Sequence, residues 1–582
     1  MSTCTVNVAS QDYADFIYRH SSASLEELTS LLGTDCVSYV NESYAVYYVP
    51  LNEALPLSIP NHSYESIPTL FGLMDTTSME ASGILSTFRQ PALGSQGKGV
   101  LMGLIDTGID YQNPLFRNSD GSTRILGLWD QTADNGGFRL VGNRLFSFPF
   151  FYGKEYTEED LNNALALEDP LTLVPSTDTN GHGTFLAGIA AGASSSSLDF
   201  TGAAPQCSLG VVKLKPAKQY LRDYYTIPEE AEAYQSNDIM LAITYLTLLA
   251  RRHRMPLVIC LGLGTNQGGH NGASPVSEVL NGLRSYLGVT AVCPAGNEAG
   301  LRHHYRGQIS GPIGGASDYD EVELRVADEE KGFVIELWAN TPEIYTIGFV
   351  SPTGEAIQRI PLTLNNENTV RFSLEPTVII VSYATALGSQ SSYLAFIRFV
   401  NPIPGIWKIR VYPTITFSGT YHMWLPIDGF VSPDTYFLQS DPYTTIVAPG
   451  NTDYPITVST YNHFDGSLFI HSSRGYTRDG RVKPDLAAPG VDVYGPGISS
   501  IPGEYPMVRM TGSSVAAAHV AGAVANIYSR QYPAESYPVM GGDLVKATLT
   551  RGAKRNPNYT YPNEEWGYGT LDLYHSFLSL RE

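Results

Sequence analysis

Three residues that lie far apart in this chain have the side chains needed for nucleophilic catalysis by a serine. They are Asp106, His182 and Ser514, each set in a block rich in small residues. A serine hydroxyl is a weak nucleophile at neutral pH, so it needs a base beside it and an acid that orients the base. The three side chains supply these parts, and the sequence therefore predicts a catalytic triad in the order Asp, His, Ser.

A fourth block could stabilise the negative charge that develops in such a reaction. It runs from Ala291 to Asn297 and has the pattern of a strand that ends in a Gly-Asn turn. We expect the Asn297 amide and the Ser514 backbone N–H to hold the oxyanion, where one donor lowers the barrier by roughly 3–4 kcal/mol. Ala295 and Gly296, in the same turn, are expected to contribute to substrate binding.

A fifth block predicts how an extended substrate is held. Residues 256–264 have the pattern of a buried strand that runs into glycines. Its last residues are expected to pair with the substrate backbone by β-augmentation. This expected substrate edge consists of Leu261, Gly262, Leu263 and Gly264. Neither a metal nor a cofactor is expected to take part.

The elements around these blocks would position the three side chains. Residues 99–106 form a continuous apolar run, typical of a strand buried on both faces of a parallel sheet, and Asp106 stands at its carboxyl end. Residues 185–191 and 515–527 favour buried helices. His182 would then lie near a helix start. Ser514 would lie at a helix N-terminus, where free N–H groups favour negative charge.

Each of these blocks alone would more often be ordinary turn chemistry, but four roles in one order are not accidental. Three neighbouring residues have plainer interpretations. His519 is expected to be a packed structural histidine rather than a second base, and Asp110 a turn residue. For Glu298 two interpretations stay open, the rim of the first specificity pocket or a surface carboxylate.

Composition limits the class of partner. The 582 residues imply two to four domains, and 36 basic against 57 acidic residues give a net charge of −21. This charge argues against nucleic acid or an anionic membrane as a partner. No apolar run is long enough for a transmembrane helix, and the first residues do not have the pattern of a signal peptide.

The number and positions of the cysteines bear on the redox compartment. The five of them are odd in number and scattered, and Cys260 and Cys293 lie in expected buried strands. Free thiols are therefore predicted rather than a disulfide framework, and synthesis in a reducing cytoplasm.

Two regions stand outside the expected catalytic unit. Short strand-like pieces at 5–8 and 44–49 flank a helical stretch at 25–32, which suits a small α+β unit at the N-terminus. Residues 318–440 change to many short strands separated by Pro, Gly and Asn turns, which favours a β-sandwich or jelly roll. The predicted boundaries are 1–66, 67–317, 318–445 and 446–582.

Together these blocks resemble the subtilisin-like serine proteases, the subtilases. The Asp, His, Asn and Ser blocks match in order, and further matches are Gly202–Pro205 with Val211–Leu214, and Pro484–Gly490. The resemblance covers roughly residues 66–315 and 450–580. It implies an α/β catalytic domain with a parallel sheet, in two parts around the inserted sandwich. It also implies that residues 1–66 are a propeptide that acts as folding chaperone and bound inhibitor.

Within that family the pattern is most similar to the clostridial spore-germination proteases. The implied function is serine endopeptidase activity on a protein substrate, the precursor of a hydrolase that degrades spore cortex, and hence an association with spores. The resemblance also implies that Ser514 cuts the chain once between about residues 60 and 76. Two alternatives are a pseudoprotease that acts in signalling and a glycan-binding protein on the same fold.

Overall fold

The computed structural model describes residues 4, 6–73, 79, 81–90, 96–133, 150–309, 319–364, 366–387, 391–530 and 540–580. Part of the expected cut window, 60–76, and the expected boundary at 318 lie outside these residues.

An eight-stranded sheet forms the centre of the α/β part, with the order β25-β24-β12-β10-β5-β8-β6-β7. Neighbouring strands are parallel except for β7, which runs antiparallel to β6. The strands are β5 (Leu101–Asp106), β6 (Ile125–Asp130), β7 (Lys154–Thr157), β8 (Ser208–Lys213), β10 (Leu257–Leu261), β12 (Val289–Pro294), β24 (Ile456–Tyr461) and β25 (Leu486–Pro489).

Helices cover both faces of this sheet because its strands are apolar on both sides. In β5, Met102 and Leu104 pack with α5 (His182–Ala191) and α9 (Ser513–Ser529), whereas Leu101 and Ile105 pack with α7 (Ser236–His253). Alternate residues of a strand point to opposite faces, so a continuous apolar run needs a layer on each side. The predicted catalytic strand and both predicted helices are confirmed.

The N-terminal unit is a three-stranded antiparallel sheet with the order β1-β3-β2 and short helices. Its elements are β1 (Tyr13–Arg19), α1 (Leu25–Leu32), β2 (Val37–Tyr39), β3 (Tyr44–Pro50), α2 (Leu51–Ala54) and η1 (Tyr64–Ser66). The predicted helix at 25–32 and strand at 44–49 are present. The strand expected at 5–8 is absent from the described residues 6–8, and β1 stands in its place in the sheet.

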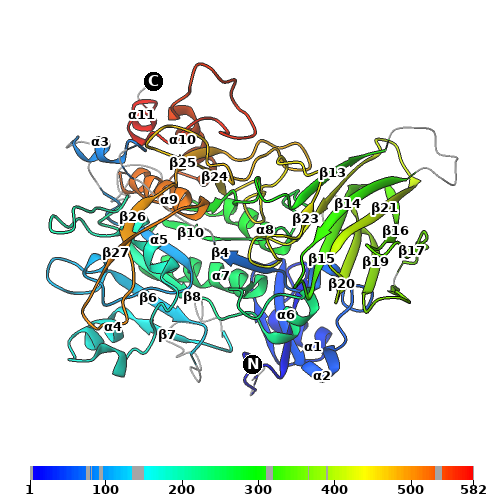
Figure 1. Cartoon of the computed structure of the whole chain (residues 1–582). Coiled ribbons are helices and arrows are strands. Elements are labelled where there is room, and N and C mark those ends of the chain that lie inside the picture. Colours follow the sequence, from blue (N-terminus) through cyan, green and yellow to red (C-terminus); the bar gives the residue numbers. More distant parts are fainter. Residues whose placement is uncertain are drawn as a thin grey trace.

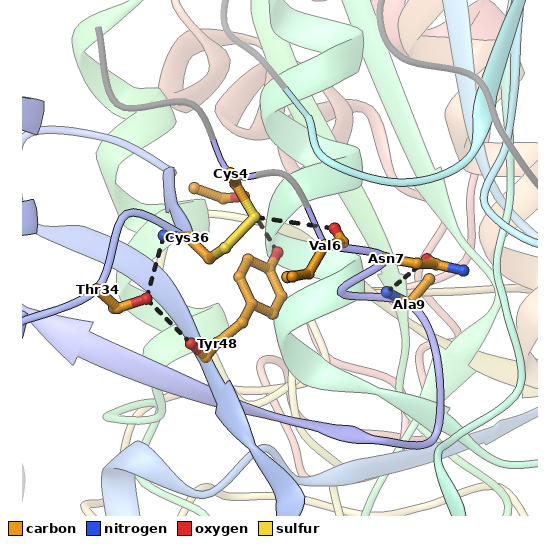
Figure 2. Close-up of a disulfide and its surroundings, with 8 residues drawn as sticks. Cys4, Val6, Asn7, Ala9, Thr34, Cys36 and Tyr48 are labelled. Carbon is orange, nitrogen blue, oxygen red and sulfur yellow. Dashed lines mark hydrogen bonds between the residues drawn. A yellow bond between two sulfur atoms is a disulfide. The ribbon is translucent and has the colours of Figure 1, made fainter.

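The cysteine prediction is wrong for two residues. Cys4 and Cys36 form a disulfide that ties the first described residue to the start of β2 (Figure 2). The Cys36 N–H also donates to Thr34 Oγ1 at 3.1 Å, within the turn before β2. Cys207, Cys260 and Cys293 are free and buried, as expected. A disulfide is unusual in a reducing compartment, so this pairing does not support the cytoplasmic expectation.

The inserted region is a sandwich of two antiparallel sheets, with β13-β22-β15-β20-β19-β18 facing β17-β16-β21-β14-β23. The first sheet consists of β13 (His304–Gln308), β22 (Thr420–Trp424), β15 (Gly332–Asn340), β20 (Ser392–Val400), β19 (Val378–Leu387) and β18 (Glu367–Arg371). The second consists of β17 (Ala356–Ile357), β16 (Ile344–Val350), β21 (Gly405–Ile415), β14 (Asp320–Val326) and β23 (Tyr436–Phe437). The sandwich thus takes one strand, β13, from before residue 318.

The N-terminal unit lies against both other parts. Figure 1 shows its blue strands beside α6 (Gln219–Tyr225) and next to strands β15 and β20 of the sandwich. One apolar cluster accordingly combines Phe16 and Tyr64 with Tyr224 and Phe396. The N-terminal unit, the α/β core and the sandwich therefore share one packed interface.

Short elements complete the described chain. They are β4 (Leu70–Leu73), α3 (Ile84–Phe88), η2 (Pro114–Phe116), α4 (Glu158–Leu165), η3 (Pro170–Thr172), β9 (Tyr234–Gln235), β11 (Leu263–Gly264), α8 (Pro275–Gly282), η4 (Leu283–Ser285), β26 (Val493–Pro496), β27 (Met507–Met510), α10 (Gly542–Gly552) and α11 (Leu573–Leu578). Among the described residues, we find no helix with the length and apolar character needed to cross a membrane.

Candidate active site

The three side chains predicted to form the triad meet at the carboxyl end of the central sheet. Asp106 ends β5, His182 is the first residue of α5, and Ser514 is the second residue of α9. His182 Nδ1 lies 2.7 Å from Asp106 Oδ1, and His182 Nε2 lies 3.1 Å from Ser514 Oγ. Each side chain is buried. A hydroxyl, an imidazole and a carboxylate in this chain of contacts can pass a proton from Ser514 to His182 while Asp106 orients the ring.

A second carboxylate, which the sequence analysis did not single out, fixes the two elements that carry the acid and the base. Asp178 Oδ1 accepts a hydrogen bond from Thr107 Oγ1 at 2.9 Å, and Oδ2 accepts from the Thr184 N–H at 2.9 Å. Thr107 Oγ1 in turn accepts from the Gly183 N–H at 2.9 Å. The only signal for Asp178 in the sequence is its place shortly before His182.

The turn after β12 places Asn297 beside the start of α9. Asn297 Oδ1 accepts a hydrogen bond from the Ser513 N–H at 3.1 Å, and the Gly296 N–H donates to Ser513 Oγ at 3.1 Å. The amide oxygen is thus oriented toward Ser513, and Nδ2 is the group of this side chain that would donate to an oxyanion next to Ser514.

The backbone of Gly262 lies against the side chains of Asp106 and His182, where there is no room for a Cβ. A Cβ at this position would lie 2.4 Å from Asp106 Oδ2 and 2.9 Å from His182 Cε1. Such contacts are too short for any side chain, so the site requires glycine between the triad and the substrate edge.

A short three-stranded sheet, with the order β11-β4-β9, runs beside the triad. In it Leu263 pairs with Leu73 and Gly264 with Gly72, antiparallel, while β4 pairs with β9 on its other side. The backbone of β4 thus occupies the position expected for an extended substrate. The N–H of Leu70 also donates to Gln267 Oε1 at 2.9 Å.

The remaining residues of the expected substrate site have other contacts. Leu261 ends β10 and pairs with Ile105 within the central sheet. The N–H of Ala295 donates to the Val458 carbonyl at 2.9 Å, so this backbone group is used inside the fold. Of all the residues expected to bind substrate, Leu263 and Gly264 are the two that pair with β4.

The structure also shows the surroundings of His519, Asp110 and Glu298. His519 is fully buried in α9 and its Nδ1 lies 2.7 Å from the Val515 carbonyl, while burial lowers the pKa of His519 to about 3. Asp110 Oδ1 accepts from the Gln112 N–H at 3.1 Å, as a turn residue does. Glu298 is not a surface carboxylate, because it is 1% exposed and lies 2.7 Å from His303 Nδ1 and 3.0 Å from Asn266 Nδ2.

Comparison with known proteins identifies the family of this chain. The model of the subtilase family matches residues 97–370 and 439–569, more than half of the chain. The chain belongs to the subtilase family. The predicted fold is confirmed with it: a subtilase α/β core, a small N-terminal α+β sheet, and an antiparallel sandwich inserted within the chain.

Among solved structures, this subtilase is similar to the CspB protease of Clostridium perfringens. The TM-score is 0.74 at 27% sequence identity, over 86% of this chain and 97% of that one. The epidermin leader peptide processing serine protease of Staphylococcus aureus aligns over 98% of this chain and 99% of its own, with a TM-score of 0.45 and 13% identity.

A curated relative matches over a shorter stretch. It is the serine protease/ABC transporter B family protein tagA of Dictyostelium discoideum, 33% identical over 144 residues. The match spans 21% of this subtilase and only 8% of the relative's length. Within the described part of this subtilase, no group of three or more His, Cys, Asp or Glu side chains is arranged to hold a metal ion.

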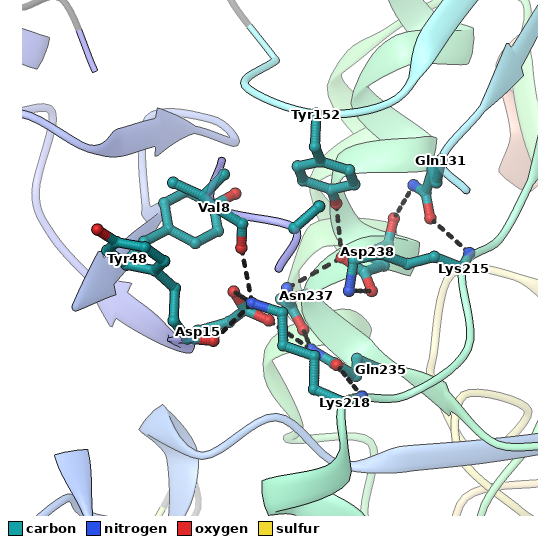
Figure 3. Close-up of polar contacts among 12 residues, drawn as sticks. Val8, Asp15, Tyr48, Gln131, Tyr152, Lys215, Lys218, Gln235, Asn237 and Asp238 are labelled. Atoms are coloured by element: carbon teal, nitrogen blue, oxygen red, sulfur yellow. Dashed lines mark hydrogen bonds and ion pairs between the residues drawn. The ribbon is translucent and has the colours of Figure 1, made fainter. Parts of the chain in front are cut away.

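A buried ion pair joins the N-terminal unit of this subtilase to the core (Figure 3). Lys218 Nζ lies 2.8 Å from Asp15 Oδ1 and also donates to the Val8 carbonyl at 2.7 Å. Gln235 Nε2, from β9 of the β11-β4-β9 sheet, donates to Asp15 Oδ2 at 2.7 Å. Asp15 of β1 is thus held by two side chains of the core. One of them comes from β9, which borders the place between β11 and β9 that β4 occupies, called the substrate cleft below.

Proposed function

We propose that this subtilase is a serine endopeptidase. The observation that carries the proposal is the contact chain from Asp106 through His182 to Ser514, with both links at hydrogen-bond distance. Ser514 attacks the scissile carbonyl, and His182 takes its proton and returns it to the leaving amine. Asp106 orients the imidazole, and Asn297 stabilises the oxyanion.

We further propose that residues 1–66 belong to a propeptide, that β4 is its tail, and that Ser514 cuts the chain after β4. The support is the backbone of β4, which is paired between β11 and β9 as a substrate would be. A tail that stays in this place after the cut would exclude protein substrates until it is displaced or digested.

The physiological substrate is proposed from resemblance. The pattern shared with clostridial spore-germination proteases supports cleavage of the precursor of a cortex-degrading hydrolase, in association with spores. The likeness to a clostridial CspB protease over most of both chains supports the same assignment.

A fluorophosphonate probe tests the peptidase proposal directly. Wild-type protein freed of residues 1–73 by limited digestion should be labelled at Ser514, and the Ser514→Ala variant should not. Thr511→Ser, a change in the same loop that keeps a hydroxyl, is the matched control and should still be labelled. Equal labelling of wild type and Ser514→Ala would refute the catalytic assignment. A wild-type protein that takes no label would favour a pseudoprotease.

A further inference from the structure

A carboxylate stands in the middle of the apolar face that the sandwich turns toward the N-terminal unit. In β15, Val334 and Trp338 belong to the cluster that packs on this unit, and Glu336 lies between them on the same face. Glu336 is 2% exposed. Placing a charged group there is costly unless it makes specific contacts, so its partners are informative.

Glu336 joins three separate parts of the chain. Tyr64 Oη, from η1 of the N-terminal unit, lies 2.9 Å from each carboxylate oxygen. The N–H of Gly268, from the loop after the substrate edge, donates to Oε2 at 2.8 Å. Trp338 Nε1, from the sandwich itself, donates to the same oxygen at 2.8 Å.

Both outside partners lead directly into the substrate cleft. Tyr64 lies six residues before the start of β4. Gly268 follows Gln267, whose Oε1 accepts the N–H of Leu70 at 2.9 Å. One side chain of the insert therefore fixes the segment that enters the cleft and the loop that receives it.

We propose that Glu336 is a positioning residue: it aligns the propeptide tail with the substrate-binding loop when it is protonated, and its ionisation loosens this alignment. The inference rests on the proposed role of residues 1–66 as a propeptide. It gives the inserted sandwich a part in controlling access to the cleft, beyond mechanical support.

The direction of the pH effect follows from the geometry. Tyr64 Oη donates to the ionised carboxylate; in neutral Glu336 this bond is reversed, with Oε1–H donating to Tyr64 Oη while Oε2 still accepts both N–H groups, so the closed arrangement keeps its contacts without a buried charge. Burial raises the pKa of Glu336 from 4.5 to about 7, although its hydrogen bonds act in the opposite sense. Once the tail leaves, Glu336 meets water and its pKa returns to the ordinary range.

At a pH between those two pKa values, Glu336 is ionised in the open state but still protonated in the closed state. Raising the pH from about 4.5 to about 7 therefore favours opening, by at most about tenfold per pH unit for one group. Above that range both states are ionised and the dependence on Glu336 ends.

Three tyrosines and one arginine close to Glu336 do not change charge in this window in the closed state. Burial raises the pKa of Tyr64, and of Tyr224 and Tyr225 on α6, above their ordinary value. The guanidinium of Arg478 lies 5.9 Å from the ring centroid of Trp338 and stays charged, because burial lowers its pKa only to about 10.

Three histidines stack on Trp424, the β22 partner of Glu336, and they are neutral over most of the same range. They are His270, His304 and His422, whose pKa values are lowered by burial.

Hydrogen exchange of the full-length Ser514→Ala chain tests the proposal without any need for catalysis. Exchange rates of peptides covering 62–73 and 263–270, corrected for the intrinsic rate at each pH, give the protection of both sides of the junction. We expect protection of both to fall together between about pH 5 and pH 7, by up to tenfold per unit. Adding Glu336→Gln should abolish this fall and leave protection at pH 7 higher, because the amide reproduces the hydrogen bonds of the neutral acid.

Glu343→Gln is the matched control. Glu343 is a buried carboxylate of the same sandwich, but its partners, among them Ser418 Oγ at 2.9 Å, lie within the insert. It should keep the pH dependence of the parent chain. A fall that persists in Glu336→Gln, or vanishes equally in Glu343→Gln, would overturn the proposal.

If Glu336→Gln fails to fold, Tyr64→Phe decides the question. This change removes one partner hydroxyl and should lower protection on both sides of the junction at once, whereas a change confined to residues 62–73 would contradict the coupling. Failure of the peptidase proposal would appear separately, in the labelling of Ser514.

Discussion

The hydroxyl of Thr107 donates a hydrogen bond to Oδ1 of Asp178 at 2.9 Å, and this contact links the strand that carries Asp106 to the helix that begins with His182. The other carboxylate oxygen accepts from the Thr184 N–H in the first turn of that helix. Asp178 therefore sets the relative position of acid and base without touching a substrate.

Replacing Asp178 should lower turnover while leaving substrate binding nearly intact. A displacement of catalytic groups by about 1 Å costs about 10²-fold in rate, so we expect a loss of that order in kcat for Asp178→Ala. Steady-state kinetics with a peptide substrate gives kcat and KM separately. The control is Asp120→Ala, whose carboxylate caps an exposed turn at Ser122, and it should behave as wild type. Unchanged kcat in Asp178→Ala would contradict the positioning role.

A methyl group at Gly262 should abolish activity. The Cβ of Gly262→Ala would stand 2.4 Å from Asp106 Oδ2, so either the carboxylate or the substrate edge must move. Peptidase assays and circular dichroism should show lost activity with the fold retained. Gly282→Ala is a matched control, since nothing lies within 4 Å of its Cβ, and it should retain full activity. Normal activity in Gly262→Ala would show that the neighbouring side chains can move to accommodate the methyl group without loss of catalysis.

The catalytic elements were predictable because their signals are local. The apolar run ending at Asp106 and the alanine-rich run after Ser514 each specify their own strand or helix. Strand β1 is not evident from the sequence because Asp15 interrupts its apolar pattern, and the partners of that residue, Lys218 and Gln235, lie 203 and 220 residues further along the chain. The Cys4–Cys36 pairing and the burial of Glu298 likewise depend on contacts that form only in the folded chain.

The buried pair of Asp15 and Lys218 should be needed for the N-terminal unit to stay docked on the core. Removing one charge leaves the other unpaired in the interior, which costs about 3–5 kcal/mol. Denaturant unfolding of Lys218→Met in the Ser514→Ala background should show a loss of that size, and the double variant Asp15→Leu with Lys218→Met should recover part of it.

An exposed ion pair supplies the control for this measurement. Arg284 and Asp543 lie 2.9 Å apart with side chains 45% and 56% exposed, so Arg284→Met should change stability by less than about 1 kcal/mol. Equal effects of Lys218→Met and Arg284→Met would mean that the buried pair does not anchor the N-terminal unit.

His519 should make the fold sensitive to acid. Burial lowers its pKa to about 3, so between pH 6.5 and about 3 the unfolded chain binds a proton that the folded chain does not. Stability then falls as the pH is lowered, by about 1.4 kcal/mol per unit from this residue. Unfolding measured across pH 4–6.5 should show a shallower slope for His519→Gln. His575→Gln, whose side chain is 64% exposed, should leave the slope unchanged; a change in both variants would refute the assignment.

The last prediction places the autoproteolytic cut. In the antiparallel register of β4 with β11, Leu73 pairs with Leu263, and Gly262, one residue earlier on that edge, stands beside Asp106 and His182. The Leu73 end of β4 is therefore its end nearer the triad, and we expect one cut at a bond within residues 73–76. Intact mass and N-terminal sequencing of purified wild type should give two fragments that copurify. Ser514→Ala and His182→Ala should each give one chain, whereas Thr511→Ser, which leaves the triad in place, should be cut as wild type is. A cut before residue 70 would show that β4 does not pair as the substrate does, and a cut at the same bond in pure Ser514→Ala would assign it to another protease.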